Sequence, residues 1–108
     1  MTDIISIAAS GLDAASKRVQ AAAKNTANAF TESYQPVDAV TKADGKGGVV
    51  TTFAPRLVSN SLGGLDNGVD LAREAVDMNM AVTAYKANAA VIKNASEMER
   101  ELIRDINV

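Results

Sequence analysis

The sequence contains no cysteine and no histidine, so the most common transition-metal ligands and the most common general base are missing. Without cysteine there are no disulfide bonds. Tryptophan is also absent, aromatic residues make up only 4% of the 108 residues, and much of the 47% apolar fraction is alanine. Large side chains contribute most of the burial energy in a small domain. We therefore expect an isolated monomer to be weakly stable.

Catalytic and metal-binding constellations are also missing. The segment Gly45–Gly48 is glycine-rich, but no helix start follows it as a phosphate-binding loop requires. Three carboxylates, Glu97, Glu99 and Glu101, stand two residues apart, so on a helix they point in different directions and form no cation site. We predict a protein that is not an enzyme and has no cofactor and no metal.

Charge and hydropathy argue against a nucleic-acid-binding protein, a membrane-spanning protein and a cleavable secretory signal. Eleven basic and thirteen acidic residues are interspersed and give a net charge of −2, so there is no basic stripe for nucleic acid. No run approaches the roughly 18 apolar residues of a transmembrane segment. The first residues, Met1–Ile5, lack the basic and apolar regions of a cleavable secretory signal. Any export is expected to use another route.

The apolar residues that are present follow a helical pattern at the two ends of the chain. In the first segment, steps of three and four residues join Ile5, Ala8, Leu12, Ala15, Val19, Ala22 and Thr26. In the last segment the same steps join Leu71, Ala75, Met78, Val82, Tyr85, Ala89 and Ile92, and after a one-residue slip Ala95, Met98, Leu102 and Ile106. Such narrow stripes predict helices that pack on other helices.

The predicted first helix begins at Thr2 or Asp3 and ends near Asn28. It contains Gly11, which indicates either a close approach by a neighbouring helix or a glycine that is simply tolerated. The predicted last helix, residues 69–108, is capped by Asp66 or Asp70 and contains no glycine or proline. It is longer than the first helix, so part of its apolar stripe needs another partner.

The middle of the chain follows a different pattern. Turn-forming residues separate two β-prone runs, Val37–Thr41 and Val49–Phe53, which predict a hairpin with a loop longer than two residues. An isolated hairpin is marginally stable in water, so it rests on a helix, pairs with another subunit or is mobile. Residues 55–68 are predicted to be irregular, with glycines at 63 and 64.

Several short motifs at both ends carry a resemblance. Near the N-terminus they are Ala9–Leu12 (ASGL), Asn25–Asn28 (NTAN) and Thr31–Tyr34 (TESY). Near the C-terminus they are Val69–Ala72 (VDLA) and Ala84–Asn88 (AYKAN). In this order the motifs resemble those of the bacterial flagellar basal-body rod and hook family, most closely a small proximal rod protein of the C type.

The resemblance implies a mainly α fold in which two long terminal helices pack as an antiparallel coiled-coil hairpin. Residues 1–34 and 66–108 would form one discontinuous helical domain, with residues 35–65 as a β-hairpin and loop insert. It also implies a structural subunit of the periplasmic rod that transmits torque in motility. The implied partners are copies of itself, other rod subunits and the flagellar type III export apparatus.

Two positions depart from the family pattern. Gly68 stands where the family usually has asparagine, and Met80–Thr83 replaces the common Glu-Ala-Gln-Arg. Losing a Gln-Arg pair removes polar contacts that help to fix the lateral register of subunits.

We predict an assembly interface made of stripe residues and polar residues beside them: Leu12, Val19, Asn25, Asn28, Leu71, Met78, Val82, Tyr85, Asn88, Ile92 and Leu102. Asn25 and Asn28 either form hydrogen bonds between subunits or end the helix, because asparagine does both. Tyr34 is expected to anchor the following turn. Tyr85 lies where an aromatic residue is usually core, and Asn88 on the same face is the best candidate for a specific subunit contact.

One alternative uses the same helices in a different protein. A cytoplasmic adaptor or export chaperone could close its two helices on each other as a hairpin and dimerise.

Overall fold

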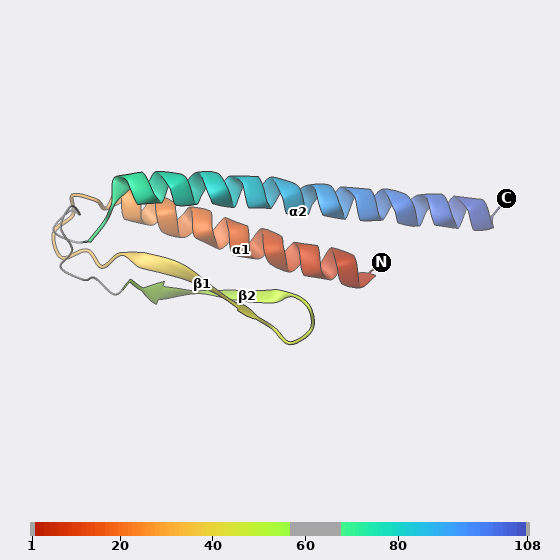
Figure 1. Ribbon diagram of the computed structural model, residues 1–108, viewed down its shortest axis with the longest axis horizontal. Helices are drawn as coiled ribbons and strands as arrows, with labels where there is room; N and C mark the ends of the chain where they lie inside the picture. Colours follow the sequence, from red (N-terminus) through yellow and green to blue (C-terminus); the bar gives the residue numbers. More distant parts are fainter. Residues whose placement is uncertain (1, 57–67, 108) are drawn as a thin grey trace.

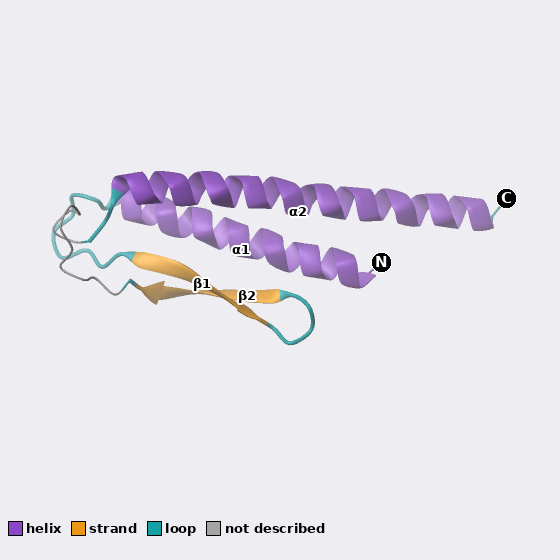
Figure 2. Cartoon of the chain, in the orientation of Figure 1, coloured by secondary structure: helices purple, strands orange, loops and turns teal. Residues whose placement is uncertain are grey.

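The computed structural model describes residues 2–56 and 68–107. Its elements are helix α1 (Thr2–Ala27), strands β1 (Val37–Ala43) and β2 (Val49–Pro55), and helix α2 (Leu71–Ile106) (Figure 2). The prediction of a mainly helical chain with a β-hairpin between two helices is confirmed. The irregular segment predicted around Gly63 and Gly64, and the capping candidate Asp66, lie outside the described residues.

The elements form three layers, with α1 in the middle (Figure 1). Helix α2 runs along one side of α1 in the opposite direction, and the hairpin lies along another side. The molecule is long and thin, with extents of 66 × 25 × 18 Å. Helix α1 therefore supplies both the surface that α2 covers and the surface that the hairpin covers.

Ser10 and Lys17, two turns apart on α1, fix the hairpin to that helix. The backbone N–H of Val49 donates to Ser10 Oγ at 3.1 Å, and Lys17 Nζ donates to the carbonyl oxygen of Thr51 at 2.9 Å. The side chain of Thr51 is buried. Of the three sequence-based possibilities for the hairpin, the structure therefore shows that it rests on a helix.

The hairpin pairs Val37 with Pro55 at one end and Ala43 with Val49 at the other. Its loop is closed by Asp44, whose Oδ1 accepts hydrogen bonds from the backbone N–H groups of Lys46 and Gly48 at 2.6 and 3.1 Å. This is the loop longer than two residues that was predicted, and each strand extends two residues beyond its predicted end. An aspartate side chain that binds nearby backbone donors stabilises such a turn.

Helix α2 begins after Asp70, whose side chain accepts from the backbone N–H groups of Ala72 and Arg73 at 3.0 and 3.2 Å. Gly68, two residues earlier, has a φ of +84°. Asparagine tolerates this left-handed region better than other side chains. Glycine adopts it without strain because it has no Cβ.

The two helices have one antiparallel register, given by two contacts. Asn25 meets Glu74 near one end, and Gly11 meets Asn88 fourteen residues further along each helix. In this register the start of α1 lies beside residue 97 of α2. The last part of α2, about nine residues or roughly 14 Å at about 1.5 Å per residue, extends beyond α1.

Candidate assembly interface

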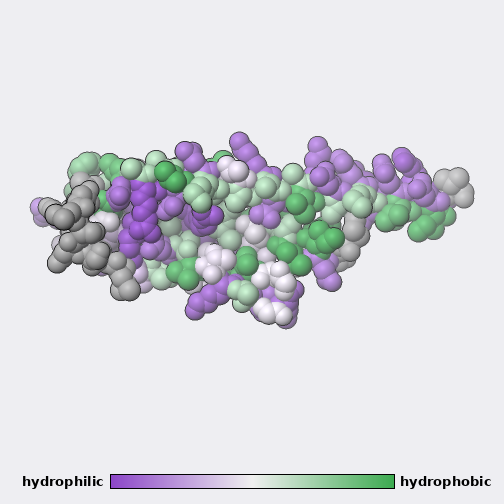
Figure 3. Space-filling model, in the orientation of Figure 1, coloured by the Kyte–Doolittle hydropathy of each residue, from purple (hydrophilic) through white to green (hydrophobic). Residues whose placement is uncertain are grey.

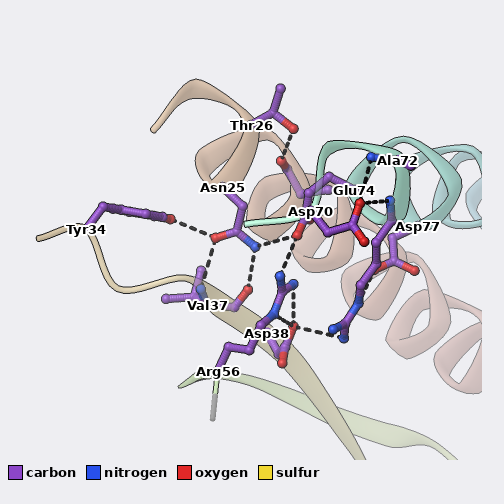
Figure 4. Close-up of polar contacts among 12 residues, drawn as sticks. Asn25, Thr26, Tyr34, Val37, Asp38, Arg56, Asp70, Ala72, Glu74 and Asp77 are labelled. Carbon is purple, nitrogen blue, oxygen red and sulfur yellow. Dashed lines mark hydrogen bonds and ion pairs between the residues drawn. The ribbon is translucent and has the colours of Figure 1, made fainter. Parts of the chain in front are cut away.

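A buried polar cluster joins the three layers at the end where α1 finishes and α2 starts (Figure 4). Its centre is Asn25, which has no exposed surface. Asn25 Nδ2 donates to the carbonyl oxygen of Val37 at 2.8 Å and to Glu74 Oε1 at 3.2 Å. Its Oδ1 accepts from the backbone N–H of Val37 at 2.9 Å and from the Tyr34 hydroxyl at 2.7 Å. One amide thus binds α1 to the turn, to β1 and to α2.

Glu74 and Arg56 form the charged part of this cluster. Glu74 is 1% exposed, and its Oε1 lies 2.7 Å from Arg56 Nη1, close enough for an ion pair although the angle is not that of a hydrogen bond. Arg56 also donates to Asp38 Oδ1 from Nε at 3.0 Å and from Nη2 at 2.8 Å. Burial lowers the Arg56 pKa, but the hydrogen bonds to Asp38 and the negative charges of Glu74 and Asp38 outweigh this and raise the pKa overall. Arg56 is therefore firmly cationic.

The turn after α1 is held by the same cluster. Arg56 donates its backbone N–H to the carbonyl oxygen of Pro36 at 2.8 Å, and the Gln35 side chain donates to the carbonyl oxygen of Arg56 at 2.7 Å. Burial, together with the negative charge of Glu74, raises the pKa of Tyr34, although Arg56 opposes this. The Tyr34 hydroxyl donates to Asn25, as an anchor of the turn should.

A small cavity of about 170 Å³ opens beside the cluster. Apolar groups line part of it. Its charged lining residues are three arginines, Arg18, Arg56 and Arg73, and three acids, Asp38, Glu74 and Asp77. The opposite charges are equal in number and partly paired, with Arg73 3.7 Å from both Asp38 and Asp77. This cavity therefore favours neither an anion nor a cation.

The contact between the helices is made of small residues. On α1, Ala8, Ala15 and Ala22 are buried, and on α2 the buried apolar residues are Ala81 and Ala95. At Gly11, an added Cβ would lie 2.7 Å from Asn88 Oδ1. Gly11 therefore marks a close approach by the neighbouring helix, the first of the two readings that the sequence allowed.

Of the buried residues on the face of α2 that meets α1, only Ala95 belongs to the predicted apolar stripe. Residues spaced seven apart, Glu74, Ala81, Asn88 and Ala95, face α1. Tyr85 is 46% exposed in the single chain, so it is not part of a core there, and its place in an assembly contact stays a prediction. The larger apolar residues Leu71, Val82 and Tyr85 are 39 to 46% exposed, whereas Ala81 and Ala95 are buried.

The predicted interface residues fall into three groups. Asn25 is buried in the polar cluster, while Asn28 donates to the carbonyl oxygen of Lys24 at the end of α1. Partly covered residues are Leu12, Val19, Met78, Asn88 and Ile92, and exposed residues are Leu71, Val82, Tyr85 and Leu102. Asn88 donates to the carbonyl oxygen of Ala84 and packs on Gly11, so its contacts here are within the chain. A role of these residues between subunits stays a prediction.

Sequence reasoning assigned no role to Arg56 or Glu74. Arg56 follows a strand, and its two carboxylate partners come from β1 and α2, so no local spacing reveals the pairing. The sequence offered one signal for Glu74. It lies seven residues before Ala81, so the two residues share the face of α2 that meets α1.

Apolar surface remains uncovered along α2. Its free end carries Met98, Leu102, Ile103 and Ile106, each more than half exposed and Ile106 80% exposed. Figure 3 shows this surface at the tip of α2 beyond α1. Contiguous exposed apolar residues mark interaction surfaces. This surface is therefore suited to binding another protein chain.

The described part of the chain contains neither a metal-binding cluster nor a helix suited to crossing a membrane. Within residues 2–56 and 68–107, no three acidic, histidine or cysteine side chains converge as a metal site. Neither described helix combines the length and the hydropathy that a membrane crossing requires.

The C-terminal part of the chain matches a known family. Residues 66–105 match the family described as flagellar basal body rod FlgEFG protein, C-terminal, and this segment includes all of α2 except its last residue. The predicted resemblance to flagellar rod and hook proteins is confirmed. That family is structural and not enzymatic, which supports the prediction that the chain is not an enzyme. A comparison with individual curated proteins gives no match.

Proposed function

We propose that this chain, a member of the flagellar basal-body rod and hook family through its residues 66–105, is a structural subunit of the rod. The observation that carries the proposal is the overlap of two features on α2. The family match and the uncovered apolar residues fall on the same helix. A helix that a single chain leaves apolar on several sides is suited to a position inside a larger assembly.

In this proposal residues 1–34 and 66–108 act as one discontinuous assembly domain, and α1 and α2 form its antiparallel coiled coil. The seven-residue repeat of Glu74, Ala81, Asn88 and Ala95 against α1 supports this. Residues 35–65 form the insert. The hairpin lies on the side of α1 that α2 leaves free, so it does not cover the exposed faces of α2. A short insert fits a small proximal member of the rod.

Torque transmission is the mechanical part of the proposal. A shaft transmits torque when its subunits cannot slide past one another, and interdigitated side chains resist sliding because packed interiors are dense and hardly compressible. The apolar residues along α2 provide side chains that neighbouring subunits can interdigitate with. Other rod subunits and copies of this chain are the proposed neighbours.

Export in an unfolded state through the flagellar apparatus, without a cleavable signal, completes the proposal. The alanine-lined contact between α1 and α2 supports it, because small side chains bury little apolar area and the helix pair separates at low cost. Assembly then takes place in the periplasm.

Genetic and fractionation experiments test the proposed function. Deletion of the gene is expected to abolish motility and filaments, and Leu71→Asp and Val82→Asp are expected to do the same by placing a carboxylate in an assembly contact. Ala90→Asp, on the outer face of α2, serves as the control. The wild-type protein should leave the cytoplasm only when the flagellar export apparatus is intact. Cytoplasmic retention in both strains would instead support the adaptor or chaperone.

A further inference from the structure

The register of the hairpin determines which of its backbone groups point away from the partner strand. The backbone N–H of Asp44 donates to the carbonyl oxygen of Gly48, and the N–H of Arg56 donates to that of Pro36 at the other end. In an antiparallel pair, hydrogen-bonded and non-hydrogen-bonded residues alternate along each strand. The odd-numbered residues of both strands therefore turn their backbone polar groups outward: Val37, Ala39, Thr41 and Ala43 on β1, and Val49, Thr51, Phe53 and Pro55 on β2.

Side chains of α1 bind some of these outward groups. On the β1 edge, Asn25 binds both the N–H and the C=O of Val37. On the β2 edge, the N–H of Val49 and the C=O of Thr51 bind two other side chains of α1. Figure 1 shows that the hairpin twists, so that β1 lies beside α1 at its start and β2 lies beside α1 near the loop. The loop half of β1 is thereby turned away from α1.

This half of β1 has what we call the open edge, which consists of Ala39, Thr41 and Ala43. Within the described residues, no group binds the outward N–H or C=O groups of these three residues. The β2 edge is less suited to pairing, because α1 binds it at two residues and Pro55 has no N–H. An extended segment adds to an exposed sheet edge through main-chain hydrogen bonds. The open edge offers such a segment three donors and three acceptors.

The open edge is poorly suited to a second copy of the same strand. An antiparallel pair of β1 strands centred on Val40 would place Asp38 of each copy opposite Lys42 of the other, which is favourable. In this register, however, the loop of one copy runs past Val37 of the other. Asn25 and α1 already occupy that position.

Registers nearer the loop avoid α1 but bring like charges together. Centring the pair on Thr41 places Asp38 opposite Asp44 of the other copy, and centring it on Lys42 places two Lys42 side chains opposite each other. Like charges directly opposite one another destabilise a strand pair. A strand of different sequence meets neither obstacle. The open edge therefore discriminates against a second copy and fits a segment of a different protein.

Side chains beside the open edge define what this segment should carry. Val40 and Lys42 lie two residues apart, so they project to the same face of the hairpin, and both are exposed. Lys46 in the adjoining loop is also exposed and adds a second positive charge, whereas the Asp44 carboxylate accepts hydrogen bonds from its own loop. An acidic residue opposite Lys42 and an apolar residue opposite Val40 complement this face.

We propose that the open edge of β1 binds an extended segment of another protein as a third, antiparallel strand, with an acidic residue opposite Lys42 and an apolar residue opposite Val40. The antiparallel orientation follows because antiparallel pairing is the more stable per residue. This surface lies on the insert, away from α2 (Figure 1). It is therefore separate from the apolar surface of α2 on which the proposed rod function rests.

Two short peptides, acetyl-TETVT-amide and acetyl-TKTVT-amide, test the proposal by nuclear magnetic resonance titration of the isotopically labelled full-length protein. In antiparallel pairing their second residue lies opposite Lys42 and their valine lies opposite Val40. Peptide is added up to on the order of 5 mM, because short strands bind weakly. The amide protons of Ala39, Thr41 and Ala43 should move to higher chemical shift as they form hydrogen bonds. TETVT should bind at least about threefold more tightly than TKTVT, and Lys42→Glu should reverse this preference.

A matched pair of variants at Thr41 tests the main-chain contact. Thr41→Ala and Thr41→Pro both lose the side-chain bond to Thr51, but only proline also removes the outward N–H. Thr41→Ala should still bind TETVT, and Thr41→Pro should bind it at least about threefold more weakly than Thr41→Ala. Slow amide exchange at Lys42, whose N–H points to β2, shows whether the hairpin is intact in each variant.

Several outcomes would overturn the proposal. These are amide signals that TETVT leaves unchanged, equal affinity for the two peptides, a preference that Lys42→Glu does not reverse, or equal binding by an intact Thr41→Pro and Thr41→Ala. Shifts of the same amides with protein concentration alone would identify a second copy as the occupant and would also overturn it. Because motility and fractionation do not depend on these peptides, the proposed rod function could hold while this inference fails, or fail while it holds.

Discussion

Glu74 on α2 and Arg56 after β2 form an ion pair of 2.7 Å in which both side chains are buried, at 1% and 7% exposure. The pair links the hairpin side of the molecule to the helix on the far side of α1. Breaking a buried pair on one side leaves an uncompensated charge, whereas removing both partners does not. The closing of α2 on α1 therefore depends on a residue of the central insert.

Replacement of Arg56 by methionine should destabilise the chain by about 3 kcal/mol or more, because it leaves the Glu74 carboxylate buried without a cation. The double variant Arg56→Met/Glu74→Met should recover most of this loss. Urea unfolding followed by the helical circular dichroism signal measures the free energy of unfolding of each protein. If the double variant is no more stable than Arg56→Met alone, the ion pair is not the reason for the loss.

The contact of Gly11 with Asn88 predicts that the effect of Gly11→Ala on stability has opposite signs in the wild type and in an Asn88→Ala variant. In the wild type, Gly11→Ala should destabilise the chain because its Cβ meets the Asn88 amide at 2.7 Å. In an Asn88→Ala background the same change should stabilise it by roughly 1 kcal/mol, the helix preference of alanine over glycine. The midpoint of thermal unfolding tests both, and a stabilising effect in the wild type would show that no close approach exists.

Asn25 is expected to be the most sensitive uncharged residue of the polar cluster. Asn25→Ala removes four hydrogen bonds and leaves buried partners unpaired, so we expect a loss of about 2 to 4 kcal/mol. Asn28→Ala is the matched control, because its side chain donates to the carbonyl oxygen of Lys24 and accepts from the Thr31 hydroxyl at the helix end, and this variant should cost less than about 1 kcal/mol. Equal losses in the two variants would contradict the central position of Asn25.

The pH dependence of stability should contain a component from Tyr34. Because the pKa of its phenol is raised in the folded chain, the unfolded chain releases this proton at a lower pH, near the ordinary value of about 10. Stability from this group is thus complete below about pH 10 and is lost as the pH rises through the folded value. Tyr34→Phe should be less stable near neutral pH but lose less between about pH 8 and pH 11. A parallel loss in both proteins would assign the decline to other groups.

The free end of α2 should contribute to association but not to the stability of the single chain. Leu102→Asp, at a residue 55% exposed beyond α1, should leave the unfolding midpoint nearly unchanged. Ala95→Asp, at a residue 5% exposed against α1, should lower the free energy of unfolding by about 2 kcal/mol or more. Comparable losses in the two variants would mean that the free end is covered within the chain.

The elements themselves could be predicted from the sequence, since helical spacing and the turn residues between positions 36 and 48 are local signals. The helix ends predicted near Asn28 and before Leu71 agree with the structure within about two residues. The orientation of α2 could not be predicted in the same way. The large apolar residues Val82 and Tyr85 indicate one face of α2, whereas the face that packs on α1 in the structure contains Ala81.

The polar cluster was predictable only in part. Asn25 and Tyr34 stand out because they belong to motifs near a helix end, and they are bonded to each other. Arg56 and Glu74 come together through the tertiary arrangement of β2 and α2, so their pairing depends on the hairpin lying on α1. No periodicity along the chain contains that information.

The thinness of the molecule has a mechanical consequence. The single chain is 66 Å long but only 18 Å thick in its thinnest direction. The bending stiffness of an elastic beam increases steeply with its thickness. Hydrogen bonds along α1 and α2 oppose stretching, but nothing behind the thin dimension opposes curvature. A single copy therefore bends easily. Any rigidity needed under load has to come from the side-by-side packing of many copies.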